Sequence, residues 1–140
     1  MNGVTITPLK RISTGKGDVL HALKCTDAGY AGFGEAYFSE VYSGQRKGWK
    51  RHNRMVLNLV VVVGRIRFYI HDDRPGSPTA GQTMQLTLSP DDDYRRLTVQ
   101  PGLWVAFEGM APQTSLLMDI IPEPHDPDEA DRREIDSITI

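Results

Sequence analysis

The sequence predicts an all-β fold, either a sandwich or a small barrel, from three observations. Val, Ile, Phe, Tyr and Thr are concentrated in short segments that rarely exceed eight residues. Gly, Pro, Asp and Ser separate these segments, as expected for tight turns. No stretch repeats apolar residues at the three- and four-residue spacing of an amphipathic helix. Ten short strands in this arrangement are typical of sandwiches and small barrels.

The predicted strands differ in how much of each face they bury. From Arg65 to Ile70, polar and apolar residues alternate at first, which indicates a strand with one solvated face. Val60 to Val63 is apolar on both faces and is expected to be covered on both, and Gly64 between the two segments marks a tight turn. The ten strands span Val4 to Thr7, Asp18 to Lys24, Phe33 to Tyr42, Arg46 to His52, Val56 to Val63, Arg65 to Ile70, Met84 to Leu88, Leu97 to Val99, Leu103 to Glu108 and Thr114 to Ile120.

Loops and a C-terminal arm complete the prediction. Turn residues fill His71 to Gly81, and further turns are expected at Ser89 to Asp93 and around Gly109 to Pro112. From Pro122 onward the chain is proline-bearing and acidic with little to bury, which predicts a surface arm or a short terminal helix. The sequence therefore predicts a single β domain over residues 1–121 and an acidic arm over residues 122–140.

Composition narrows the classes of function. The 140 residues are 39% hydrophobic and 24% charged, which fits one globular domain, and the net charge of −2 favours neither nucleic acid nor an anionic membrane. Met1 to Leu9 lacks the pattern of a secretory signal, and the longest apolar run, Leu59 to Val63, is far below the ~20 residues of a membrane span. The lone Cys25 predicts a reduced, partly buried thiol and a cytoplasmic location.

The order of several motifs along the chain resembles the dTDP-4-dehydrorhamnose 3,5-epimerase family of cupin-fold sugar-nucleotide enzymes. Gly17 to Lys24 followed by Phe33 to Ser39 looks like the opening of its short-chain members. The most specific match is the loop from Asp72 to Gly81, and the resemblance covers roughly residues 15 to 121. The remaining motifs are GQRKGWKRH from Gly44 to His52, then Gly64, then Leu88-Ser89, then PGLWVAF from Pro101 to Phe107.

The resemblance implies a fold, a substrate class and an assembly. The fold is expected to be a cupin jelly roll, a double-stranded β-helix whose mouth binds ligands, and the family is dimeric, so a homodimer is expected. The implied partner is a nucleotide-activated 4-keto sugar of polysaccharide or deoxysugar biosynthesis. Two alternatives stay open. One is a non-catalytic cupin that binds a nucleotide sugar or serves as a regulatory subunit, and the other is an isomerase that moves the ketone along the ring.

The resemblance also assigns catalytic positions, and this chain departs from them. The family's base histidine falls on Lys50, an arginine three residues earlier falls on Lys47, and the acid tyrosine falls near Met118. Lys50 can act as a base if burial or neighbouring cations lower its pKa from ~10.4, and is otherwise a charged contact for phosphate or sugar. Reprotonation must then come from water or from Tyr37, Tyr69 or Asp119. The predicted catalytic residues are Lys50 and His52.

A metal site and other cofactors are not predicted. Many cupins hold a metal through a histidine, a second histidine two residues later, a nearby carboxylate or glutamine, and a histidine on a later strand. Here these positions carry Lys50, His52, Met55 or Val56, and Val105, so one ligand of four is present. Neither an ammonium nor an aliphatic side chain coordinates a metal ion.

Cations cluster around the predicted catalytic residues. Strand alternation places Arg46, Lys50, His52 and Arg54 on one side and Lys47, Trp49 and Arg51 on the other. Such a wall attracts a diphosphate, with Trp49, Tyr37 or Trp104 stacking on a base or sugar, and an exposed edge strand protected by charge is the competing interpretation. The predicted substrate-binding residues are Glu35, Tyr37, Lys47, Trp49, Arg54 and Arg74.

Overall fold

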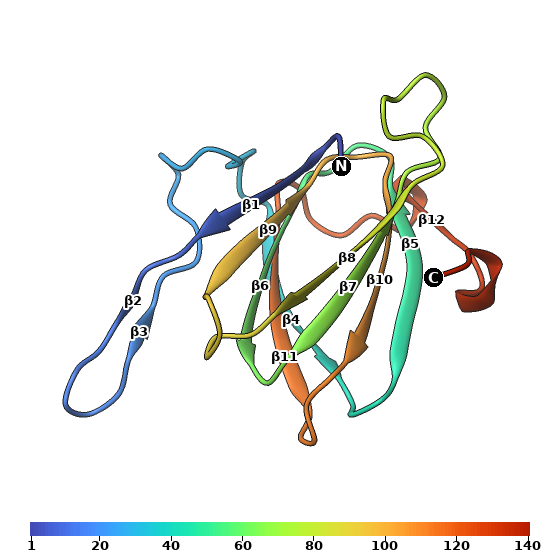
Figure 1. Ribbon diagram of the computed structural model, residues 1–140. Helices are drawn as coiled ribbons and strands as arrows, with labels where there is room; N and C mark the ends of the chain where they lie inside the picture. The colour runs from blue at the N-terminus through green and yellow to red at the C-terminus, as the bar shows by residue number, and fades with distance from the viewer.

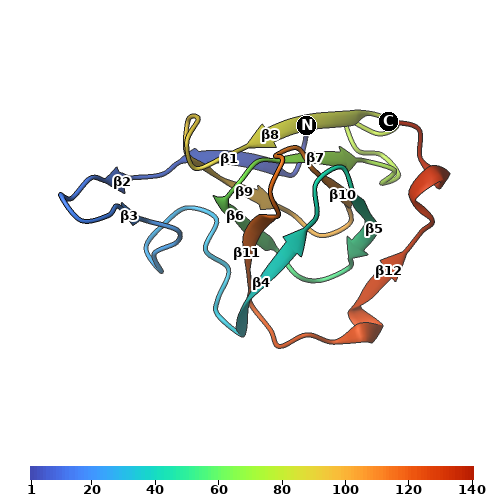
Figure 2. The same cartoon turned by 90° about the horizontal axis from the view of Figure 1, so that it is seen from below.

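The computed structural model describes residues 1–140 and contains two five-stranded antiparallel sheets that face each other (Figures 1 and 2). The first sheet has the order β1 (Val4–Pro8), β9 (Arg95–Val99), β6 (Leu57–Val63), β11 (Ser115–Ile121) and β4 (Glu35–Val41). The second has the order β12 (Ala130–Arg132), β5 (Arg46–His52), β10 (Trp104–Gly109), β7 (Ile66–His71) and β8 (Thr83–Leu88). The all-β jelly roll expected from the sequence is confirmed.

The main core lies between the two sheets. Its 15 buried residues come from both inner faces, for example Leu59 and Leu97 from the first sheet and Phe68 and Ile70 from the second. Nine of the ten predicted strands agree with the structure to within two residues at each end. Their alternation and turn residues were sufficient because each strand has an inner face to bury.

One strand prediction is wrong in extent. Of the segment from Asp18 to Lys24, only β3 (Val19–Leu20) is a strand, and it pairs with β2 (Arg11–Ile12) in a hairpin that projects from the body of the molecule (Figure 1). Ile12 and Val19 are 43% and 51% exposed, because no second layer covers this hairpin. Cys25, in the following loop, is also exposed, so the expectation of a partly buried thiol is wrong.

A bulge where β5 pairs with β10 changes the face on which the cations of β5 lie. Lys50 lies opposite Val105, but Lys47 lies opposite Phe107, so β5 carries one extra residue between these pairs. Gly48 in the bulge has a φ of +139°, and a Cβ there would lie 2.5 Å from the Cβ of Ala106. The alternation predicted for β5 therefore holds from Trp49 to His52 and is wrong for Arg46 and Lys47, which precede the bulge.

The bulge moves Lys47 to the inner side and turns its neighbours outward. The Lys47 ammonium lies 5.4 Å from the centre of the Phe107 ring, on the same side as Lys50. The Arg46 guanidinium instead lies over Tyr69, which packs with Trp49 in a smaller cluster outside the barrel.

The C-terminal segment packs along the edge of the second sheet. β12 pairs with β5, and single 3-10 turns at Pro127–Glu129 and Ile135–Ser137 flank β12 (Figure 2). Glu129 and Ile138 are buried, the latter against the outer cluster around Trp49. The expected arm thus has buried residues that its acidic composition did not indicate. Neither 3-10 turn has the length or the hydropathy needed to cross a membrane.

Candidate active site

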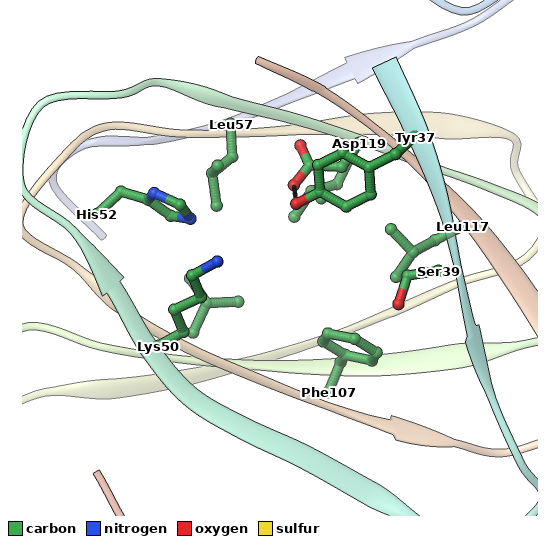
Figure 3. A pocket seen from close by; sticks show the side chains of 10 residues that line it. Tyr37, Ser39, Lys50, His52, Leu57, Phe107, Leu117 and Asp119 are labelled. Carbon is green, nitrogen blue, oxygen red and sulfur yellow. Dashed lines mark hydrogen bonds between the residues drawn. The ribbon is translucent and has the colours of Figure 1, made fainter. Parts of the chain in front are cut away.

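A cavity of about 90 Å³ opens between the sheets, with polar groups set into apolar walls (Figure 3). Strand alternation explains the pairs that face it, because Tyr37 and Ser39 on β4 are two residues apart, as are Lys50 and His52 on β5. The full lining is Tyr37, Ser39, Lys50, His52, Leu57, Leu59, Val105, Phe107, Leu117 and Asp119. The structure therefore brings the two predicted catalytic residues together in one cavity.

His52 is held by a carboxylate from the C-terminal segment. Its Nδ1 lies 2.7 Å from the Glu129 Oε2, and the two side chains are only 7% and 0% exposed. The other Glu129 oxygen, Oε1, accepts hydrogen bonds from the backbone N–H groups of Arg54 at 2.8 Å and Met55 at 3.1 Å. Because a carboxylate accepts, neutral His52 carries its proton on Nδ1 and leaves Nε2 as an acceptor.

Burial also keeps His52 neutral. Desolvation lowers the pKa of His52 below its ordinary value, and the nearby charge of Lys50 acts in the same direction, although Glu129 opposes both. A neutral imidazole with a free Nε2 at the cavity is the form that can accept a proton at neutral pH.

Tyr37 and Asp119 form a second pair on the other side of the cavity (Figure 3). The Tyr37 hydroxyl lies 2.8 Å from the Asp119 Oδ2, while Oδ1 is buried without a hydrogen-bond partner. Burial raises the pKa of Asp119 to about 7, and burial together with this carboxylate raises the pKa of Tyr37 above its ordinary value. Near neutral pH, Asp119 therefore exists in both protonation states, whereas Tyr37 stays protonated.

Lys50 extends its amine into the cavity between these two pairs (Figure 3). The side chain is half-buried among Val105, Phe107 and Leu57, and its Nζ makes no hydrogen bond or ion pair with the protein. Burial lowers the pKa of Lys50, and the neighbouring charge of Arg132 lowers it further, while Asp119 and Glu129 act against them.

Among the predicted substrate-binding residues, Tyr37 lines the cavity and Lys47 lies beside it. The Lys47 Nζ donates hydrogen bonds to the Ser39 Oγ at 2.9 Å and to the Glu40 carbonyl at 3.0 Å, which places it beside the cavity lining. Glu35 lies two residues before Tyr37 on the same strand and accepts a hydrogen bond from the backbone N–H of His125 at 2.9 Å.

The other predicted contacts lie away from the lining. Trp49 is 1% exposed in the outer cluster and donates to the Ile135 carbonyl at 2.9 Å, so its ring has no free face for a ligand. Arg54 is exposed and pairs with Glu123 at 2.7 Å. Trp104 also lies in the outer cluster, where arginine side chains cover it and its indole N–H donates to Asp73 at 2.9 Å.

Arg74 belongs to the loop that carries the most specific motif. It binds Asp72, which is fully buried and also accepts hydrogen bonds from the hydroxyls of Ser77 at 2.5 Å and Thr79 at 2.6 Å. These hydrogen bonds, with that of Arg74 first, hold the pKa of Asp72 well below its usual range. The motif thus fixes the loop, and the structure does not place Arg74 in the cavity.

Two features of the site did not follow from sequence reasoning. The resemblance placed the acid near Met118, which lies on β11 between Leu117 and Asp119, but only these two neighbours line the cavity. Glu129 is separated from His52 by 77 residues, and no spacing motif links the two. The only sequence feature that pointed to Glu129 was its carboxylate, and it lies in a segment whose composition predicted a solvent-exposed arm.

No protein-family model and no curated protein matches this sequence. Among solved structures, a dTDP sugar isomerase from Desulfovibrio desulfuricans G20 is 35% identical with a TM-score of 0.94, covering 97% of this chain and 87% of that one. A dTDP-4-dehydrorhamnose 3,5-epimerase from Sulfolobus tokodaii is 20% identical with a TM-score of 0.86, covering 100% of this chain and 82% of that one. A second distant likeness is QdtA, a sugar 3,4-ketoisomerase from Thermoanaerobacterium thermosaccharolyticum in complex with TDP, at 15% identity and a TM-score of 0.78, covering 95% and 90%.

The two distant structures share the fold. The likeness to the Desulfovibrio protein is of another kind, because it combines 35% identity with nearly complete coverage of both chains. The motifs of the sequence, the jelly roll and this identity agree, and the chain belongs to the dTDP-sugar isomerase and epimerase family of cupins.

Proposed function

We propose that this protein is an isomerase of nucleotide-activated keto sugars that removes and returns a proton on a carbon next to the ketone. One observation carries the proposal. His52, bound from behind by Glu129, and Tyr37, paired with Asp119, face one largely apolar cavity from different strands. Isomerisation next to a ketone needs a base, an acid and a site shielded from water, and this arrangement supplies all three.

In the first step, His52 is the base. Its Nε2 accepts the proton from the carbon, and the electron pair of the broken C–H bond moves into the enolate. Glu129 accepts the Nδ1–H throughout and stabilises the imidazolium that forms, because the contact is short and excluded from water. Glu129 is thus a positioning residue.

In the second step, Tyr37 returns a proton to a carbon of the enolate. As the hydroxyl gives up its proton, it takes another from protonated Asp119, so a tyrosinate with a high pKa does not accumulate. The overall change consumes the proton of Asp119 and leaves one on His52, and exchange with solvent restores both groups. The same two steps serve epimerisation at a ring carbon and migration of the ketone, so the reaction type stays open between them.

Lys47 is proposed as the contact for the diphosphate. Its ammonium is exposed beside the cavity and uses two of its three donors on Ser39 and Glu40, so one donor remains for a phosphate oxygen. The complex of QdtA with TDP supports a nucleoside diphosphate as the ligand class for this fold.

The test is proton exchange with solvent. The protein is incubated in heavy water with a dTDP-4-keto-6-deoxy sugar, and deuterium next to the ketone is followed by NMR. We expect exchange by the wild-type protein and a loss of ~100- to 10,000-fold in His52→Gln, since this is the usual contribution of a general base. If no keto sugar exchanges while dTDP still raises the melting temperature, the protein is the non-catalytic sugar-nucleotide binder.

Three finer expectations accompany this proposal. A homodimer is supported by large apolar side chains left exposed on one sheet, with Phe38 63% and Val63 44% exposed, and light scattering measures the mass in solution. A cytoplasmic location and a role in polysaccharide or deoxysugar biosynthesis stay predictions. Sugar-nucleotide dehydratases or glycosyltransferases encoded next to this protein's gene would support the biosynthetic role.

A further inference from the structure

We infer that Lys50 is a nucleophile, whose Nζ forms a transient imine with the ketone of the bound sugar. The inference rests on the proposed function, because it needs a keto sugar in the cavity. Lysine amines form such imines when they lie in an apolar site without a carboxylate partner. Lys50 meets both conditions.

The position of Lys50 is the first argument. Its side chain ends inside the cavity, between His52 on one side and Tyr37 with Asp119 on the other (Figure 3). Its neighbours along the stem, Val105 and Phe107, are apolar. A keto-sugar ring held between His52 and Tyr37 therefore lies beside this amine.

The absence of an ion pair is the second argument. No carboxylate oxygen lies within 4.0 Å of the Nζ, because the Asp119 Oδ2 is bound by Tyr37 and Glu129 is bound by His52. Glu129 is engaged by His52, and Asp119 is engaged by Tyr37 through Oδ2 while its Oδ1 has no hydrogen-bond partner, so no ion pair fixes the amine. Lys47 provides a comparison within the same strand, since its ammonium is exposed and held by two hydrogen bonds and an aromatic ring.

The chemistry balances with groups that the cavity already holds. The lone pair of the neutral Nζ forms a C–N bond to the carbonyl carbon, and the carbonyl oxygen takes a proton from Tyr37 to give a carbinolamine. A proton passes from the nitrogen to the hydroxyl, the C–O bond breaks, water leaves, and a protonated imine remains. His52 removes the proton from the adjacent carbon, and the electron pair of the C–H bond moves toward the imine nitrogen to give an enamine. Protonated Asp119 restores the Tyr37 hydroxyl, which then returns a proton to carbon. Water attacks the imine carbon, the C–N bond breaks, and the surplus proton returns to the tyrosinate, so that the ketone and the neutral Lys50 amine are released.

This role accounts for two features together. Lys50 lies in the cavity without an ion-pair partner, and the histidine that can accept a proton lies two residues later with its own carboxylate. A protonated imine withdraws electrons more strongly than a ketone does. In this arrangement Lys50 serves as the covalent electron acceptor while His52 supplies the base.

Reductive trapping tests the inference. The wild-type protein is incubated with a dTDP-4-keto-6-deoxy sugar and sodium cyanoborohydride, which delivers hydride to the imine carbon and leaves a stable secondary amine. We expect the intact mass to rise by the mass of the sugar nucleotide less one oxygen atom. Peptide mapping is expected to place this mass on Lys50, and dTDP without a ketone is expected to give no adduct.

Two variants distinguish a nucleophilic role of Lys50 from a purely electrostatic one. Lys50→Arg keeps the cation but cannot form an imine, so we expect no adduct and at least ~100-fold slower deuterium exchange. Lys16→Arg, at the tip of the projecting hairpin, is the matched control and is expected to give both adduct and exchange at the wild-type level. Mapping of the wild-type adduct keeps the test decisive if Lys50→Arg does not fold.

Each remaining outcome decides between the two proposals. If the wild-type protein exchanges deuterium but gives no adduct on Lys50, or if Lys50→Arg exchanges normally, then Lys50 is a charged contact and the imine is overturned while the isomerase stands. An adduct on Lys50 without any exchange supports the imine and overturns the isomerase. Neither exchange nor adduct, with dTDP bound, overturns both.

Discussion

At the scale of single residues, the proposed chemistry depends on one group that is free to accept a proton and one that still carries a proton. His52 must be neutral to accept a proton and Asp119 must be protonated to supply one through Tyr37. Burial favours both states, because it disfavours an imidazolium and a carboxylate alike. The same cavity thus prepares a base and an acid at one pH.

The pH dependence of kcat/KM is expected to report this pair. Activity should fall above about pH 7 as Asp119 ionises, and below the lowered pKa of His52 as the imidazole gains a proton. Asp119→Asn cannot donate the proton, so its residual rate should lack the decline above pH 7. If kcat/KM of Asp119→Asn declines above pH 7 in the same way as that of the wild type, another group is responsible for the loss of activity at high pH.

Glu129→Gln tests the positioning of His52. If the amide oxygen keeps the backbone N–H groups of Arg54 and Met55, its NH2 group faces the His52 Nδ1 and makes that nitrogen the acceptor. The proton then lies on Nε2, and we expect kcat to fall ~100-fold or more with little change in dTDP affinity. Isothermal titration with dTDP alongside the exchange assay distinguishes this from a loss of folding.

At the scale of elements, β5 shows what sequence patterns can and cannot predict about a strand. Its bounds, Arg46 to His52, were predicted without error because turn residues flank it. Which side chains of β5 face the cavity was not predicted correctly, because the alternation of residue types does not reveal the extra residue in the bulge at Gly48. Arg46 and Lys47 were consequently assigned to each other's side. Register is a property of the pair of strands, and β10 enters only through the three-dimensional structure.

Gly48→Ala measures what the bulge requires. An alanine there combines a φ of +139° with a Cβ 2.5 Å from that of Ala106, so we expect a loss of about 2–4 kcal/mol in the free energy of unfolding. Gly44→Ala is the matched control, because its φ is +74° but nothing lies within 4 Å of the added Cβ. Urea denaturation of both variants separates the contact from the backbone strain, and equal losses would assign the cost to φ alone.

At the scale of the whole molecule, the site depends on segments far apart in the chain. The cavity takes side chains from β4, β5, β6, β10 and β11, and the carboxylate behind His52 comes from the C-terminal segment that packs on β5. Local patterns predicted the strands and turns, and the resemblance of the ordered motifs to a known family implied the jelly roll. They could not predict Glu129, since its contact with His52 exists only after the last segment has packed against the edge of the second sheet.

The free energy of unfolding of the whole protein is expected to depend on pH through the buried carboxyl group of Asp119. Its folded pKa of about 7 lies above its unfolded value of ~3.9, so its stabilising contribution is complete below about pH 4 and is lost as the pH rises through 7. His52 acts with the opposite sign, because its folded pKa is lowered and neutralisation with rising pH favours the folded state.

Comparing the wild type with Asp119→Asn isolates the contribution of Asp119, because the contribution of His52 is common to both proteins. From pH 4.5 to pH 8, we expect the free energy of unfolding of wild type to fall by on the order of 2–4 kcal/mol relative to Asp119→Asn, since each unit of pKa shift corresponds to about 1.4 kcal/mol. Urea denaturation at the two pH values measures this difference. Parallel curves would mean that Asp119 ionises in the folded protein as readily as in the unfolded chain, and the proton supply assigned to Tyr37 would then lack its source.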